Sequence, residues 1–385
     1  MNSGPPEDTE APSTFDPNGM AASTETAPTQ WSAPALWRVL RGLAVAGGLV
    51  ALLALTFMAL GVAPGQGLSA LWVGAFGDAQ SGHLYPLSET LVKTSPLLLT
   101  GLSVVVAWRA GLFSIGAEGQ LLMGALAATA LGISCARLPG PILTVLMLLA
   151  GIAAGAFWGW IAGWLRVRRS VQEVISTIML NYIALYLLGW MVEGPLQERA
   201  HRIAQSDPLP NAALFARLIP PAWTGGIATR LHSGVLLALL AVPVLTIFLY
   251  ATPAGFALRV VGQNAEVARA ARFPVDSLRL RAMAISGALA GLAGVVELLG
   301  INGRLVRDFS PGWGYTAIPV ALLGGLHPVG TLFSALFFGA LTAGSGNLER
   351  FSGVSAELIQ VIQAVAVLAV VGIRAWQARR AGREE

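Results

Sequence analysis

The stretch Gly255–Arg281 reads GFALRVVGQNAEVARAARFPVDSLRLR and separates two apolar blocks of the sequence. Within it, Asn264 is a good helix N-cap, because its side-chain oxygen can accept from a free backbone N–H of the first turn. Glu266 follows at a position where the helix dipole favours a negative charge. Pro274 disfavours the helical conformation in the residue before it. The pattern therefore predicts a short helix over residues 264–272.

Small and basic residues give this short helix the character of a docking element. Small side chains let another backbone approach closely, and the helix carries four of them, Ala265, Ala268, Ala270 and Ala271. The whole stretch contains more basic than acidic residues, with Arg259, Arg269, Arg272, Arg279 and Arg281 against Glu266 and Asp276. A plain surface loop does not need such a helix, so we expect the stretch to bind a partner protein.

The composition of the whole chain predicts an α-helical membrane protein. Of its 385 residues, 55% are hydrophobic and 11% are charged. A soluble domain of this size cannot hide so much apolar surface. Apolar blocks near the ~20 residues that cross a bilayer recur along the chain. The expected fold class is an all-α polytopic integral membrane protein, located in the cell inner (plasma) membrane.

The apolar blocks divide the sequence into membrane spans and connecting segments. The expected spans are 42–63, 91–108, 111–133, 141–165, 171–193, 232–251 and 282–300, followed by apolar sequence at 315–343 and 357–374. The transmembrane domain is expected at 38–376, with a cytoplasmic loop at 255–281, external loops at 64–90 and 194–231, and cytoplasmic tails at 1–37 and 377–385. The first tail is rich in Pro, Ser, Thr and Ala, so we expect it to be disordered.

Arginine clusters predict which side of the membrane each connection faces, because cytoplasmic segments carry an excess of basic residues. Clusters follow the fourth, the sixth and the last span, and Arg38 and Arg41 precede the first. Both termini are therefore expected in the cytoplasm, and the number of crossings must be even.

This even number requires the apolar sequence 315–343 to cross the membrane twice. Gly324-Gly325 interrupts it, and Pro328 and Gly330 are expected to interrupt it again. The piece 315–326 is only about half a bilayer long at ~1.5 Å per residue. A short or broken helix is tolerated where it is buried in protein or lines a cavity. We therefore expect about ten helical segments, at least one of them short or broken.

Polar residues inside one apolar block are candidates for a functional site, because charges in a span are costly and are by default functional or paired. The segment GLFSIGAEGQLLMG, residues 111–124, contains Glu118 and Gln120, with Ser114 four residues before Glu118 on the expected helix face. Two glycines beside Glu118 allow a neighbouring helix to pack closely. The patch either lines a substrate pathway or makes hydrogen bonds that fix helix packing.

A second polar set lies in STIMLNYIALY, residues 176–186. Thr177 and Asn181 are four residues apart and share a helix face. Asn is costly in contact with lipid, so this face is expected to point inward. Here too, pathway lining and contacts between helices are both open interpretations.

The sequence lacks the motifs of an enzyme or of a nucleotide-binding protein. Lys93 is its only lysine and no G-x-x-x-x-G-K-[ST] loop exists, so this chain cannot hydrolyse a nucleotide by itself. No nucleophile elbow or H-E-x-x-H motif occurs either. The scattered histidines and the single cysteine indicate no metal site, and the arginines do not form a nucleic-acid-binding patch. We expect no catalytic residue, metal or cofactor in this chain, and no nucleic-acid partner.

Several motifs in a fixed order resemble one family. They are GLFSIGAEGQ, ISTIMLNYIA and GQNAEVARAARF, followed by ISGALAGLAGVVELLG and GYTAIPVALLGGLHPVG. Together they resemble the permease subunits of ATP-binding-cassette importers, in the branch that carries simple sugars, branched-chain amino acids and, most closely, nucleosides. The resemblance covers roughly residues 90–375.

The resemblance implies an importer complex with a permease of about ten helices. Two permease subunits, paralogous or identical, form the pathway, two cytoplasmic ATP-binding subunits use the ATP, and an extracytoplasmic binding protein delivers the substrate. The family's coupling loop matches residues 262–273, which implies that this helix docks on the ATPase. The residues implied in coupling are Gly262, Asn264, Ala265, Glu266, Ala268, Ala271, Arg272 and Phe273.

The expected function is therefore a permease subunit that imports a nucleoside, or a simple sugar, and is coupled to separate ATPase subunits. The expected substrate-pathway residues are Ser114, Glu118, Gln120, Thr177 and Asn181. The alternative is a stand-alone secondary carrier or channel for a small polar solute. The sequence shows no chain of intramembrane acids and bases of the kind that proton-coupled carriers use, which favours the importer.

Overall fold

The computed structural model describes residues 63–78, 84–200, 203–220 and 228–352, and a few isolated positions between 47 and 58 and at 361 and 364. By its internal contacts the chain divides into a segment Met1–Gly48 and a unit Leu49–Glu385, and the helices described below all belong to the second. The expected tails at 1–37 and 377–385 lie outside the described residues, as do the expected spans at 42–63 and 357–374 apart from a few positions.

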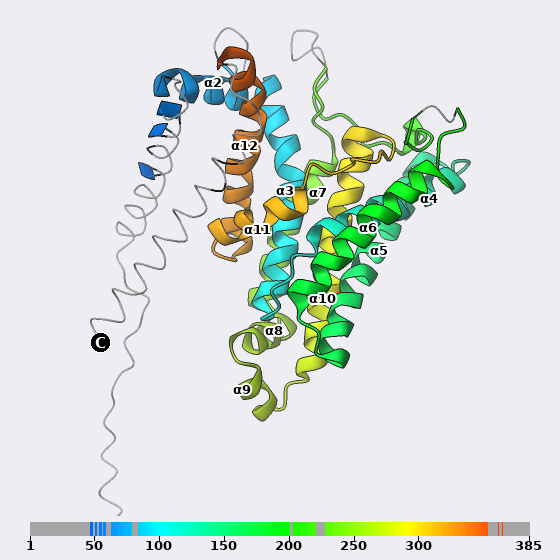
Figure 1. Ribbon diagram of the computed structural model, residues 1–385, viewed down its shortest axis with the longest axis vertical. Coiled ribbons are helices and arrows are strands. Elements are labelled where there is room, and N and C mark those ends of the chain that lie inside the picture. The colour runs from blue at the N-terminus through cyan, green and yellow to red at the C-terminus, as the bar shows by residue number, and fades with distance from the viewer. Residues whose placement is uncertain are drawn as a thin grey trace, which may run out of the picture. The chain divides into compact units, whose positions relative to one another are not determined.

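The described residues form a bundle of helices with mostly short connections (Figure 1). Their bounds are α2 Pro64–Phe76, α3 Leu84–Arg109, α4 Ala117–Ser134, α5 Gly140–Arg169, α6 Glu173–Glu193, α7 Gly234–Ala251, α8 Pro253–Gln263, α9 Ala265–Ala270, α10 Val275–Glu297, α11 Trp313–Leu323 and α12 Pro328–Ser352. A π-helical segment, Leu298–Asn302, continues α10. Extended pairing in this part of the chain is limited to isolated bridges.

Six of these helices are long and apolar enough to cross a membrane: α3, α5, α6, α7, α10 with its π-helical continuation, and α12. The apolar helix α11 is shorter. Helices satisfy their own backbone hydrogen bonds, which is why they can cross lipid. The expected all-α polytopic fold class, with a short helix, is confirmed. The positions of the termini relative to the membrane remain a prediction.

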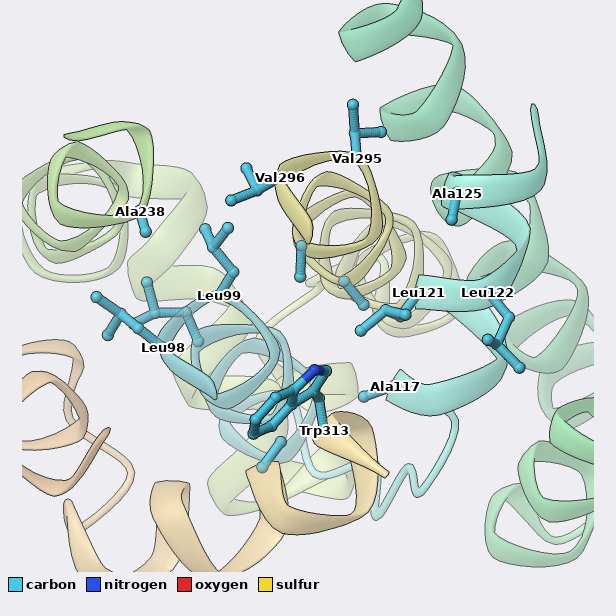
Figure 2. Close-up of a cluster of buried hydrophobic side chains, with 14 of the residues drawn as sticks. Leu98, Leu99, Ala117, Leu121, Leu122, Ala125, Ala238, Val295, Val296 and Trp313 are labelled. Carbon is cyan, nitrogen blue, oxygen red and sulfur yellow. The ribbon is translucent and has the colours of Figure 1, made fainter. Parts of the chain in front are cut away.

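The apolar core forms where α10 packs against α3 and α4, with the start of α11 beside α3 and α4 (Figure 2). Leu98 of α3, Leu121 of α4 and Val296 of α10 are each fully buried there. Trp313, at the start of α11, closes the same cluster and is 5% exposed. Lipid tails are as apolar as these side chains, so close packing rather than exclusion of water stabilises their contacts.

Glycines bring α5 and α10 into backbone contact. Gly151, Gly155 and Gly159 recur every four residues along one face of α5, a spacing that places them in a single row. A methyl group at Gly155 would overlap the carbonyl oxygen of Gly287 on α10, and one at Gly291 would overlap the carbonyl oxygen of Gly151. The small-xxx-small pattern therefore lets the backbones of α5 and α10 touch.

Most of the segment expected as an external loop at 64–90 is helical, and the side of the membrane that it faces remains a prediction. Residues 64–76 form α2, and α3 begins at Leu84 rather than at residue 91. Polar residues in the first turns of α3 find partners inside the structure. Glu89 pairs with Arg230, and Thr90 Oγ1 donates to the carbonyl of Ala75 at 2.8 Å. With these groups satisfied, the helix can continue through them.

The span expected at 111–133 begins later, because residues 111–116 are not helical and α4 starts at Ala117. Gly111 takes a left-handed φ of 73°, which turns the chain after α3. Ser114 therefore lies before α4. The expectation that it shares a helix face with Glu118 is wrong. By contrast, α10 begins earlier than expected. It starts at Val275, about two turns before the expected position 282.

The break expected at Gly324-Gly325 is confirmed, and it has the form of a Schellman motif. The second glycine has a φ of 69°, and the N–H of Leu326 reaches back to the carbonyl of Ala321 at 2.9 Å. The further interruption expected at Pro328 and Gly330 is wrong. Both lie in the first turn of α12, where a proline has no intrahelical N–H bond to lose.

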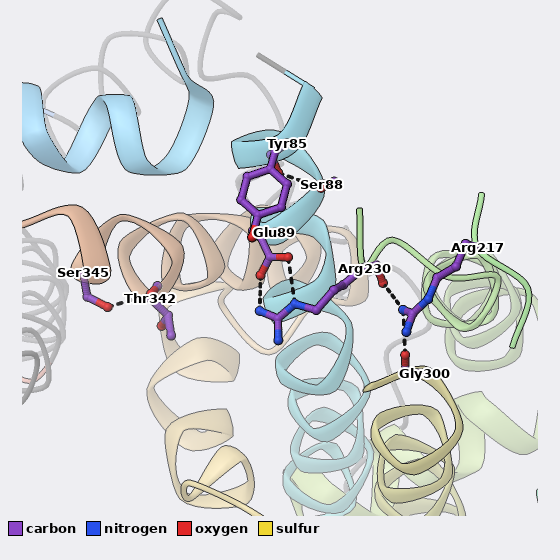
Figure 3. A network of polar contacts seen from close by, with 8 residues as sticks. All are labelled: Tyr85, Ser88, Glu89, Arg217, Arg230, Gly300, Thr342 and Ser345. Atoms are coloured by element: carbon purple, nitrogen blue, oxygen red, sulfur yellow. Dashed lines mark hydrogen bonds and ion pairs between the residues drawn. The ribbon is translucent and has the colours of Figure 1, made fainter. Parts of the chain in front are cut away.

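Ionic contacts tie the connection between α6 and α7 to the ends of α3 and α10 (Figure 3). Arg230 makes an ion pair with Glu89, in which its Nε lies 3.0 Å from Oε1. The hydrogen bond that Arg230 donates to Glu89 raises the pKa of Arg230 above its ordinary value. Arg217 donates to the carbonyl of Arg230 at 2.7 Å and to that of Gly300 at 2.9 Å. This connection lies at the opposite end of the helices from α8 and α9 (Figure 1).

Candidate functional site

Asn181 of α6 occupies the position of an N-cap for α4. Its Oδ1 accepts from the backbone N–H of Gly119 at 2.9 Å, and its Nδ2 donates to the carbonyl of Ile115 at 2.9 Å. Gly116 at the N-cap position of α4 supplies no side-chain cap of its own. A side chain at Gly119 would overlap Asn181, so the glycine is what lets α6 come this close. A polar side chain from one helix thus satisfies the free end of another.

Thr177 and Glu173 hold the non-helical segment before α4. Thr177 Oγ1 accepts from the N–H of Ile115 at 3.2 Å, and Glu173 Oε1 accepts from the N–H of Phe113 at 3.3 Å. The second carboxylate oxygen of Glu173 pairs with Arg166 Nε at 3.1 Å. Thr177 and Asn181 are each 1% exposed, so the prediction that their shared face points inward is confirmed.

Glu118 connects α4 to the short helix α11. Its Oε2 accepts from the backbone N–H of Gly314 at 2.7 Å, in the first turn of α11. A carboxylate at this position suits the positive end of a helix dipole. A side chain at Gly314 would overlap the backbone of Glu118, so the two helices touch here.

The remaining two candidates, Ser114 and Gln120, are also buried. Ser114 Oγ accepts from the N–H of Gly116 at 3.2 Å, and its carbonyl accepts from Trp108 Nε1 at 3.2 Å. Gln120 Oε1 is buried without a hydrogen-bond partner among the described residues, and its amide nitrogen lies beside Gly159 of α5. An unpaired buried amide oxygen is costly. Gln120 therefore differs from the other four candidates, because its side-chain oxygen can still accept a hydrogen bond.

The five candidates therefore meet in one region, where α4, α6, α11 and the segment before α4 converge. Their hydrogen bonds favour the interpretation that Glu118, Thr177 and Asn181 hold helices together. Next to them, Tyr315 of α11 is 44% exposed, and its hydroxyl accepts from Asn181 Nδ2 at 3.4 Å. Tyr182 of α6 is 50% exposed. Tyr182 lies midway along α6, away from the helix ends where tyrosine normally meets the membrane interface.

The start of the short helix in the polar stretch agrees with expectation. α9 spans Ala265–Ala270, and Asn264 Oδ1 accepts from the N–H groups of Glu266 at 2.9 Å and Val267 at 3.1 Å. The predicted N-cap is confirmed. The polar stretch is also helical before and after α9. Helix α8 ends directly before Asn264, and α10 begins directly after Pro274.

The end of α9 has a different cause from the one expected. Arg272 takes a left-handed φ of 61°, and the N–H of Phe273 reaches back to the carbonyl of Ala268 at 2.9 Å. This is a Schellman motif, which here uses an arginine where glycine is usual. Pro274 instead occupies the N-cap position of α10.

The residues implied in coupling divide into an inner and an outer set. Ala268 is fully buried in a small cluster with Val261 and Val275. The expectation that it forms part of a docking surface is therefore wrong. A side chain at Gly262 would overlap the carbonyl oxygen of Arg109, so this glycine packs inside the unit. The exposed set on and after α9 consists of Glu266, Val267, Arg269, Ala270, Ala271 and Arg272.

A further group of residues near this stretch was not singled out from the sequence. Arg109, the last residue of α3, donates from Nε to the carbonyl of Leu326 at 2.8 Å. His327 stacks on Tyr250, and Arg259 of α8 lies over the same tyrosine. Burial and, to a smaller extent, the charge of Arg109 lower the pKa of His327. The partner of Arg109 lies 217 residues away, so no local signal could have indicated the pair.

These features define a multi-pass membrane protein, with polar contacts buried between its helices and a capped helix displayed at one end. The comparison of residues 87–371 with known families identifies the branched-chain amino acid transport system / permease component family. The chain belongs to this family, and it is a permease rather than an enzyme.

The similarity to characterised relatives extends over most of the chain. It is 38% identical to a glucose ABC transporter permease of Haloferax volcanii over 301 residues, 77% of this chain and 79% of the relative. It is 38% identical to a guanosine ABC transporter permease of Bacillus subtilis over 321 residues, 82% and 88% of the two chains. A nucleoside ABC transporter permease of Lactococcus lactis is 32% identical over 317 residues, 82% and 85%. No solved structure matches.

Proposed function

We propose that the chain is a permease subunit of an ATP-binding-cassette importer that carries a nucleoside across the plasma membrane. Two of the relatives named above are permeases for guanosine or nucleosides and one is a permease for glucose, so a simple sugar is the competing substrate class. Exposed aromatic rings such as those of Tyr182 and Tyr315 suit a nucleobase, because a ring can stack on the base.

The observation that carries the coupling role is the outer face of α9. This six-residue helix is capped at both ends and its one buried side chain, Ala268, anchors it to α8 and α10. Val267 is 59% exposed on the other side. An apolar residue displayed between charged ones, on a rigid short helix, is suited to the core of a protein contact with a polar rim.

The complex that this function requires has further subunits. Separate ATP-binding subunits dock on α9 from the cytoplasm, a second permease subunit completes the pathway, and an extracytoplasmic binding protein delivers the substrate to the side of the α6–α7 connection. The positive-inside rule supports this orientation, because the arginines of α5 and α8–α10 gather at one end of the bundle.

The pathway is proposed to pass along the exposed face where Tyr182 and Tyr315 lie. In this arrangement Thr177, Asn181, Glu118 and Ser114 act behind the surface, since their hydrogen bonds hold α6, α4 and α11 in place. Gln120 has an oxygen without a partner in the described structure, so it is the candidate with free capacity for a polar ligand.

Substitutions on the two faces of α9 test the coupling role. Val267→Glu places a charge at the centre of the proposed contact, whereas Gln172→Glu places one on an exposed residue before α6 at the same end of the bundle. Both variants should insert and fold. In proteoliposomes with the partner subunits, Val267→Glu should lower ATP-dependent uptake about tenfold or more, as expected for a central interface residue. Equal uptake by the two variants would refute docking through this face.

A further inference from the structure

The short helix α11 is capped at both ends by charged residues that border the α3–α4 connection. At its N-terminal end, Glu118 Oε2 accepts from the N–H of Gly314 at 2.7 Å. After its C-terminal end, Arg109 donates to the carbonyls of Leu326 at 2.8 Å and Gly325 at 3.4 Å. A carboxylate at the first turn and a guanidinium at the last both complement the helix dipole. The residues on either side of the α3–α4 connection thus bind both ends of α11.

Helix α8 is connected to the turn after the C-terminal end of α11 through an aromatic stack. Tyr250, in the last turn of α7, stacks on His327 with ring centroids 4.9 Å apart. The guanidinium of Arg259 on α8 lies 4.8 Å from the Tyr250 ring centroid, within the range of a cation–π contact. His327 Nδ1 accepts from the N–H of Val329 at 3.2 Å, which orients the imidazole ring.

A second route from α8 towards α11 begins with a backbone contact between α8 and the end of α3. Any side chain at Gly262, near the end of α8, would overlap the carbonyl oxygen of Arg109. A Cβ atom at Gly111 would lie 3.1 Å from the Gly262 Cα, so the two chain segments touch. Packed interiors are not compressible, and a displacement of α8 must therefore move the end of α3 or break this contact.

We propose that α11 is the element that carries movement of α8 and α9 to the substrate pathway. The inference rests on the proposed function, in which an ATPase displaces α9. The two routes from α8 converge on the turn after α11. The opposite end of α11 carries Tyr315, which is 44% exposed and whose hydroxyl accepts from the buried Asn181 of α6. Arg109 is the positioning residue of this device, because it belongs to the backbone contact and also binds the turn.

The test follows the exposure of α11 during the ATPase cycle. A cysteine replaces Tyr315 in a Cys135→Ser background, which removes the single native cysteine. The maleimide labelling rate is measured in the full importer complex, with and without a non-hydrolysable ATP analogue. Arg109→Met then breaks the contact with the turn. Arg169→Met, an exposed arginine at the end of α5, is the matched control.

With Arg109 present, the analogue should change the labelling rate about tenfold, within the range typical of coupled sites. Arg109→Met should abolish that change and the uptake, yet leave subunit assembly and ATP hydrolysis intact, whereas Arg169→Met should keep both. A purely structural role for Arg109 would lower assembly and hydrolysis together. An unchanged response in Arg109→Met would overturn the proposal.

Two controls keep the outcome decisive. A label at Ile318, half-buried on α11, replaces the one at Tyr315 if the latter variant is inactive. ATP-dependent uptake by the cysteine-free parent is measured in parallel. If the parent shows none, the proposed importer function fails. If the parent transports and α11 does not respond, the failure belongs to this inference alone.

Discussion

Asn181 on α6 caps α4 from outside, with its Oδ1 2.9 Å from the backbone nitrogen of Gly119. The same side chain also binds the carbonyl of Ile115, so both its donor and its acceptor are used between helices. A residue that had two open interpretations thus acquires a definite structural role. The amide also reaches the hydroxyl of Tyr315 on α11, which places the exposed face of the site next to this cap.

Replacing Asn181 by Leu should destabilise the protein. The substitution leaves a buried N–H of Gly119 and the carbonyl of Ile115 without partners, which costs about 1–3 kcal/mol for each unsatisfied group. Thermal unfolding of the purified protein in detergent measures the loss. Gln172→Leu is the control, because Gln172 lies on the exposed side at the start of the same helix and makes no capping bond. Equal melting temperatures for the two variants would contradict the cap.

The glycine contact between α5 and α10 predicts a large effect from a single methyl group. Gly155→Ala forces that methyl into the carbonyl of Gly287, and the helices must separate. Overpacking of this kind costs about 1–3 kcal/mol. In the control Gly189→Ala, the methyl meets nothing within 4 Å. Circular dichroism melting curves should show a lower midpoint for Gly155→Ala alone. A similar shift in both variants would contradict the contact with Gly287, because a general effect of replacing glycine by alanine would then explain it.

The ion pair between Glu89 and Arg230 should show a measurable coupling energy. Glu89 is 9% exposed and the pair has two hydrogen bonds, but the Arg230 side chain is 45% exposed, which screens the charges. A double-mutant cycle with Glu89→Gln and Arg230→Met should give about 1 kcal/mol. The exposed pair Arg199–Asp207 should give less, because its arginine is 92% exposed. The reverse order would show that burial does not strengthen the first pair.

His232 predicts a loss of stability in mild acid. Burial and the charge of Arg217 lower its pKa to about 4 from 6.5, and its ring stacks on Phe215. Above pH 6.5 the ring is neutral in both states and has no effect. As the pH falls from 6.5 towards 4, the unfolded chain takes up a proton and the folded chain does not. The contribution is at most about 3 kcal/mol.

Unfolding measured across this pH range in the parent and in His232→Leu isolates the contribution of the histidine. The difference between the two proteins should change with pH between 6.5 and 4 and level off below it. Parallel curves over the whole range would show that His232 titrates normally in the folded protein.

Sequence patterns predict those parts of the structure whose causes are local. Asn264 caps α9 through bonds to the next few residues, and the inward face of Thr177 and Asn181 follows from their spacing. Composition and block length are sufficient for the membrane fold class, and the glycines at 324–325 mark the break between α11 and α12.

Distant partners explain what the sequence pattern missed. Glu89 lies inside α3 because Arg230, 141 residues away, neutralises it. The segment before α4 leaves the helical conformation because side chains of α6 satisfy its backbone. Ala268 has the residue type of a docking surface, yet it is buried because α8 and α10 fold back around α9. None of these contacts has a signature within a few residues of the position it determines.

Uptake by reconstituted protein tests the importer function most directly. The chain is placed in proteoliposomes with a second permease subunit and ATP-binding subunits, with the binding protein outside, ATP inside and a radiolabelled nucleoside or hexose as substrate. Uptake should require ATP, the ATPase and the binding protein, and should be greater for the nucleoside. Uptake by this chain alone, without ATP or partner subunits, would contradict the proposed function and would identify a stand-alone carrier or channel.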